Sequence, residues 1–157
     1  MNLGLKVEHE CNRLLAPKGA LGHGDTTENR TNSLIFLYKL ELIDEFTFIK
    51  VSKAIDLTDF ENPEENLAST ILEDAKVKTA MKVKVSLPDH EVLRKNAERE
   101  YNFLLTHARI LGQADSAFIR AIYLNILFRL QLISYASFSR GMDVLKYMDF
   151  SFKKQSS

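Results

Sequence analysis

The stretch from Ser116 to Phe138 constrains the fold most, because the helix it predicts is apolar on two opposite sides. At about 100° per residue, its apolar residues fall into two seams separated by narrow polar stripes. One seam consists of Ile119, Ile122, Tyr123, Ile126, Leu130 and Ile133, and the other of Ala121, Leu124, Phe128, Leu132 and Tyr135. Such a helix has to be covered on both sides, so the sequence predicts that it packs between two partners.

One of these partners is expected directly upstream. From Pro88 to Leu111, apolar residues recur at steps of four and three along an otherwise charged stretch, which predicts a long helix. Gly112 is placed to end this helix and Asp115 to begin the next one, so the connection is short and the two helices should be antiparallel neighbours. We therefore predict an all-α helical bundle centred on a long antiparallel C-terminal hairpin. The most buried residues should include Leu104, Ile122, Ile126, Leu130 and Ile133.

Helix-start signals divide the N-terminal half. Asp25 with Glu28 forms a capping-box pattern, Asp44 is a second cap, and Asn62-Pro63 is a third start followed by acidic residues. No internal repeat is expected. The predicted helices of this half are 3–15, 26–42, 45–57 and 63–80.

An alternative fold comes from two short segments that alternate with period two. Tyr38 to Leu42 and Met81 to Val85 both show the pattern of half-buried strands. They would make the protein α+β, with a small sheet from residues 33–52 and 80–87. The helical assignment is favoured because caps and apolar spacing agree over longer stretches.

Composition limits the size and class of the protein. The 157 residues suit one domain, for which we expect a single helical domain over 1–152 and a flexible tail over 153–157. Twenty-one basic and 21 acidic residues leave zero net charge, so nucleic acid is a less favoured partner than protein. The one cysteine, Cys11, suits a reducing compartment, and we expect a cytoplasmic protein. Arg120 and Arg129 interrupt the most apolar stretch, so no membrane span is expected.

Candidate catalytic residues are few. The four histidines show no zinc-like spacing, and the loop rich in glycine lacks a phosphate-binding pattern, so we expect no catalytic residue, metal site or cofactor. The nearest arrangement to a helical nuclease is a polar site of Arg99 and His107, in which an imidazole would move a proton and a guanidinium would hold phosphate. These two residues stand eight positions apart, which is far for that chemistry on one helix.

One family resemblance is carried by residues 14–48. The run Leu14 to Gly22, followed by Leu37 and by Leu40 to Glu45, resembles the helical mannitol-operon-repressor family over about forty residues. This resemblance implies a transcriptional regulator. An Arg-Asn…His element common in that family has no counterpart at 54–60, so no functional residue is transferred.

The function that follows is a non-catalytic protein-interaction or regulatory module. It should self-associate, as a homodimer, through its C-terminal helices, because the Ser116–Phe138 helix has one seam more than the upstream helix covers. The predicted interface consists of Ala121, Leu124, Phe128, Leu132 and Tyr135. The alternatives are a transcriptional regulator and a small helical nuclease.

Overall fold

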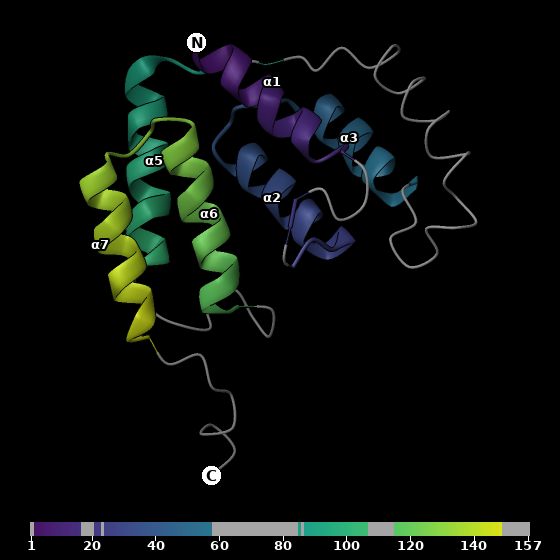
Figure 1. The fold of residues 1–157 in the computed structure, drawn as a ribbon. Helices are drawn as coiled ribbons and strands as arrows, with labels where there is room; N and C mark the ends of the chain where they lie inside the picture. Colours follow the sequence, from purple (N-terminus) through teal and green to yellow (C-terminus); the bar gives the residue numbers. More distant parts are fainter. Residues whose placement is uncertain are drawn as a thin grey trace. The chain divides into compact units, whose positions relative to one another are not determined.

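The computed structural model describes residues 2–16, 21–22, 24–57, 85, 87–106 and 115–148. These ranges fold into helices joined by short turns, which confirms the all-α class (Figure 1). The predicted helix over 63–80 lies outside the described residues. The helices are α1 (Leu3–Arg13), α2 (Thr27–Lys39), α3 (Glu45–Leu57), α5 (His90–Leu104), α6 (Ala117–Arg129) and α7 (Tyr135–Lys146).

The chain divides into two compact units, an N-terminal unit of Met1–Pro88 and a C-terminal unit of Asp89–Ser157. In the N-terminal unit α2 packs against α3, and in the C-terminal unit α6 packs against both α5 and α7 (Figure 1). A single domain over 1–152 stays a prediction, and the tail over 153–157 lies outside the described residues.

The α+β alternative is wrong for the residues that the structure describes. Residues 33–39 belong to α2 and residues 45–52 to α3, because capped helices override the period-two alternation near Tyr38. Among the described residues the β pairing is limited to one isolated antiparallel bridge between Ile43 and Val85.

The prediction of one continuous helix from Ser116 to Phe138 is also wrong. Helix α6 ends at Arg129, and the amides of Gln131 and Leu132 bond back to the carbonyls of Phe128 and Leu127, both at 2.9 Å. These two bonds form a Schellman motif, in which Gln131 takes a left-handed φ of 59°. Ser134 then caps α7 by accepting a hydrogen bond from the Ser137 amide at 3.1 Å. The break was not expected because it contains neither glycine nor proline.

The new helix boundaries change the burial of the predicted core. Leu104, Ile126 and Leu130 are buried as expected, whereas Ile122 and Ile133 are only half-buried. Upstream, α5 ends at Leu104, seven residues before the predicted end, and residues 107–114 of the predicted hairpin lie outside the described ranges.

Two of the predicted helix caps are displaced by one residue. Thr26 caps α2 by accepting from the Asn29 amide at 3.0 Å, and Ser116 caps α6 by accepting from the Ile119 amide at 3.2 Å. Asp25 and Asp115, which were expected in these roles, bond elsewhere. Asp44 does cap α3, since its Oδ1 accepts from the Thr47 amide at 2.7 Å.

The chain contains an internal repeat, contrary to the sequence-based expectation. A shift of ninety residues superimposes the bounds of α2 on those of α6, and the cap Thr26 on the cap Ser116. It also pairs Gln131 with Glu41, which has a left-handed φ of 62°. Positions that are identical in the two copies include Leu14/Leu104, Leu15/Leu105, Leu21/Leu111, Gly22/Gly112, Asp25/Asp115, Arg30/Arg120, Leu34/Leu124, Leu37/Leu127, Leu40/Leu130, Leu42/Leu132, Ile43/Ile133 and Phe48/Phe138.

Candidate functional site

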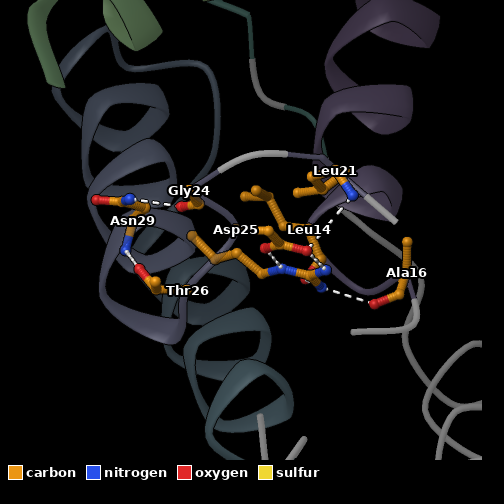
Figure 2. Close-up of polar contacts among 8 residues, drawn as sticks. Leu14, Ala16, Leu21, Gly24, Asp25, Thr26 and Asn29 are labelled. Atoms are coloured by element: carbon orange, nitrogen blue, oxygen red, sulfur yellow. Dashed lines mark hydrogen bonds and ion pairs between the residues drawn. The ribbon is translucent and has the colours of Figure 1, made fainter. Parts of the chain in front are cut away.

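Each unit contains a buried arginine that binds one aspartate and the end of the preceding helix; we call this arrangement the arginine clamp. In the N-terminal unit, Arg30 Nε donates to Asp25 Oδ1 and Nη2 donates to Asp25 Oδ2, both at 2.7 Å. Its Nη1 donates to the carbonyls of Leu14 at 2.9 Å and Ala16 at 2.7 Å. Figure 2 shows Asp25 beside the backbone of Leu14 and Ala16, where α1 ends.

The C-terminal unit repeats this clamp bond for bond. Arg120 Nε donates to Asp115 Oδ1 at 2.8 Å, and Nη2 donates to Asp115 Oδ2 at 2.7 Å. Arg120 Nη1 donates to the carbonyls of Leu104 and Thr106, both at 2.8 Å. The sequence separations are the same as in the first clamp, so the clamp is a property of the repeat rather than of one unit.

The clamp gives hydrogen-bond donors to the carbonyls at a helix end and also pairs the buried charge of the arginine. The last carbonyls of an α-helix have no partner inside the helix and carry partial negative charge. The guanidinium supplies donors and positive charge at that place, while the aspartate neutralises it and fixes its orientation. Both side chains are almost fully buried in each clamp. The buried charges therefore tie α1 to α2 and α5 to α6, a role in the fold.

Two buried titratable groups have raised pKa values. Burial, together with the charges of Glu10 and Glu8, raises the pKa of the Cys11 thiol to about 12. Burial, together with Asp115 and Glu100, raises the pKa of the Tyr123 hydroxyl to about 12. Both groups are protonated at neutral pH, so Cys11 has little of the thiolate character that a nucleophile or metal ligand needs.

The predicted polar site is only partly described. The side chain of Arg99 lies on α5, is 61% exposed and pairs with Glu100, with 3.4 Å between Nε and Oε2. His107 lies outside the described residues, so the pairing of Arg99 with His107 stays a prediction. In the described part of the chain, no group of three or more His, Cys, Asp or Glu residues could hold a metal ion.

Aromatic side chains gather where α2 meets α3, a region we call the α2–α3 corner (residues 38–50). The rings of Tyr38 and Phe48 have centroids 5.1 Å apart. Phe46 is 62% exposed, and Lys50 Nζ lies 4.3 Å from the centroid of its ring. Beside Tyr38 is an open hollow of about 540 Å³, whose lining residues are Tyr38, Glu41, Ile43, Asp44, Glu45, Leu87 and Pro88.

The repeat places a second aromatic pair in the α6–α7 corner (residues 128–140). Phe128 and Phe138 are equivalent to Tyr38 and Phe48, and their rings stack with centroids 4.9 Å apart. Tyr135 adds a third ring, 5.9 Å from Phe128, and is 68% exposed. The exposed ring of Tyr135 therefore lies next to the half-buried rings of Phe128 and Phe138 on the surface of this unit.

The five residues of the predicted interface have different surroundings. Leu124 is 0% exposed and faces the interior of the C-terminal unit, where its side chain would lie 3.0 Å from a Cβ added at Gly141. Phe128 and Tyr135 meet in the α6–α7 corner, although on two helices rather than one. Ala121 and Leu132 are half-buried. Self-association through these residues stays a prediction, with the corner as its exposed part.

Sequence reasoning missed both clamps, although a signal was present. In each copy a Leu-Leu pair is followed by Leu-Gly, then by an aspartate, then by an arginine five residues later. The spacing of Asp25 to Arg30 equals that of Asp115 to Arg120, which an alignment of the chain with itself would have shown. Treating the two aspartates as helix caps hid their pairing with arginine.

Comparisons with known proteins add no relative. No family model matches the chain, and neither a curated protein nor a solved structure matches it. The resemblance to the mannitol-operon-repressor family therefore stays an expectation. Among the described helices, none has the length and apolar character required to cross a membrane.

Proposed function

We propose that the protein is a non-catalytic interaction module that self-associates through α6 and α7. The observation that carries this proposal is the α6–α7 corner, where Tyr135 is largely exposed above the stacked rings of Phe128 and Phe138. Aromatic side chains grouped at the surface in this way are typical of protein contact sites. Tyrosine and arginine are also the residues most enriched at the centres of such contacts.

The charge around this corner supports a protein contact. Arg129 and Arg140 flank the aromatic residues, and the sequence from Ser116 to Met142 contains no acidic residue. An aromatic centre bordered by arginines would combine a large buried area with charges that select the partner. Asp115 and Arg120 of the same unit pair with each other in the clamp.

Sedimentation equilibrium over a micromolar concentration range tests this function. We expect a concentration-dependent shift from 18.0 kDa toward twice that mass. Tyr135→Ala should weaken the association, because it removes the exposed ring of the corner. Tyr147→Ala is the matched control, since Tyr147 lies just beyond the other end of α7 and is 88% exposed. A monomer at every concentration would contradict the proposal.

A further inference from the structure

The two corners of the repeat differ in charge at equivalent positions, although Leu40, Leu42 and Ile43 are matched by the identical Leu130, Leu132 and Ile133. Acidic residues occur at three positions of the α2–α3 corner whose counterparts in the α6–α7 corner are uncharged. These pairs are Glu41/Gln131, Asp44/Ser134 and Glu45/Tyr135. Basic residues are kept at both corners, as Lys39/Arg129 and Lys50/Arg140. The α6–α7 corner is therefore basic, and the α2–α3 corner has carboxylates around its hollow.

This charge difference argues against docking of the α6–α7 corner on itself. In a two-fold contact between identical patches, each arginine meets the same basic patch of the other copy. Like charges brought together across an interface are strongly unfavourable. The basic corner needs an acidic surface, and the second aromatic corner of the same chain is acidic.

The hollow of the α2–α3 corner has the chemistry that an arginine side chain requires. Its wall is apolar at Tyr38, Leu87 and Pro88 and acidic at Glu41 and Glu45. An arginine can lay its methylene groups on apolar surface while its guanidinium reaches carboxylates. Tyr38 also offers a ring face for a cation–π contact.

We propose that the α6–α7 corner of one copy docks on the acidic hollow of the α2–α3 corner of a second copy. Arg129 and Arg140 supply the positive charge, and Tyr135 supplies the apolar centre. This inference rests on the proposed self-association and names the two surfaces that meet. When both copies engage in this way, the contact occurs twice in a closed, two-fold dimer.

A charge-exchange experiment on the full chain tests this pairing. The acid-reversed variant carries Glu41→Lys and Glu45→Lys, and the base-reversed variant carries Arg129→Glu and Arg140→Glu. Each variant alone places like charges at both contacts, so each should dimerise at least about tenfold more weakly than the wild type. An equimolar mixture of the two restores opposite charges at both contacts, and should return the dimer to near wild-type affinity.

Control variants separate this effect from a general change in charge. Glu91→Lys with Glu98→Lys makes the same charge change on exposed positions of α5, and should leave the dimer unchanged. Far-UV circular dichroism of every variant checks that its helices are retained. If the charge reversals alter the helix content, the single variants Glu45→Gln and Arg140→Gln are used instead. Each should weaken dimerisation and reduce the dependence of the dimer affinity on salt concentration.

The outcomes distinguish this inference from the proposed function. A wild-type protein that is monomeric contradicts the self-association itself. If the acid-reversed variant dimerises as tightly as the wild type while Tyr135→Ala dimerises more weakly, the pairing of the two corners is wrong but the self-association stands. The pairing is also wrong if the equimolar mixture of the two reversed variants stays monomeric. It is wrong too if the reversals change the thermal stability of the protein but not its dimer affinity.

Discussion

Arg120 and Asp115 form a two-bond ion pair with both side chains fully buried in the C-terminal unit. Arg30 and Asp25 form the same pair in the N-terminal unit. A buried ion pair of this kind is maintained by its complete set of hydrogen bonds rather than by attraction alone, because removing charges from water is costly. Each clamp should therefore be sensitive to the loss of one partner.

We expect Asp115→Ala to lower the free energy of unfolding by about 3–5 kcal/mol, since it leaves the Arg120 guanidinium buried without its counter-charge. Urea unfolding followed by circular dichroism measures this change. Glu91→Ala is the control, because its ion pair with Arg94 is exposed and long, at 3.6 Å. Such a surface pair contributes little. An Asp115→Ala variant as stable as the wild type would show that the clamp does not stabilise the unit.

The two units should respond separately to loss of their clamps. Asp25→Ala should lower the hydrogen-exchange protection of amides in α1 and α2, because Arg30 ties the end of α1 to α2. Asp115→Ala should instead lower the protection of amides in α5 and α6. Equal loss over both units in either variant would contradict this prediction and indicate that the chain opens as one cooperative unit.

The N-terminal helices were predictable because local signals and packing agree there. The predicted and observed bounds of α3 are the same, and those of α1 and α2 differ by a few residues, where each helix ends in turns without glycine. Asp44 was identified as a cap because its pattern is local. By contrast, Asp25 pairs with Arg30 on the following helix, and Arg30 in turn donates to the carbonyls of Leu14 and Ala16 just after the preceding helix. Sequence spacing alone does not predict this arrangement, because it depends on how the turns between the helices fold.

The C-terminal prediction failed for a related reason. Leu130 to Ile133 continue the apolar periodicity of α6, so nothing in the local pattern separates α6 from α7. The break depends on Gln131 adopting a left-handed conformation that is more usual for glycine or asparagine. Of the interface predicted on that single helix, Phe128 and Tyr135 lie in the aromatic corner and Leu124 lies in the core.

The left-handed residue gives a prediction about the turn itself. Gln131→Val should lower the free energy of unfolding by about 1–2 kcal/mol, because a β-branched residue tolerates a φ of 59° poorly. Gln131→Gly should be neutral or stabilising by up to about 1 kcal/mol, since glycine adopts this conformation without steric cost. Chemical denaturation of both variants measures the difference. A valine variant as stable as the glycine variant would contradict the Schellman turn at the end of α6.

The buried thiol of Cys11 gives a prediction about alkaline pH. Its pKa lies at about 12 in the folded protein against 9.0 for an exposed thiol, chiefly because burial disfavours the thiolate. Above pH 9 the unfolded chain loses this proton and the folded chain keeps it, so the unfolded state binds fewer protons and stability falls as pH rises. The contribution is fully present below pH 9 and is lost progressively up to about pH 12.

Urea titrations at several pH values and a thiol-modification assay check this prediction. Cys11→Ala should remove part of the decrease in unfolding free energy between pH 9 and pH 11, measured by urea titration at each pH. The Tyr123→Phe variant, which removes a hydroxyl whose pKa is also about 12, should remove a separate part of the decrease that begins near pH 10.

In the folded wild type, an aromatic disulfide reagent should modify Cys11 slowly at pH 8, and quickly once urea is added, because the side chain is 0% exposed. Rapid modification without urea, or the same pH dependence in Cys11→Ala as in the wild type, would show that the thiol is accessible in the native protein.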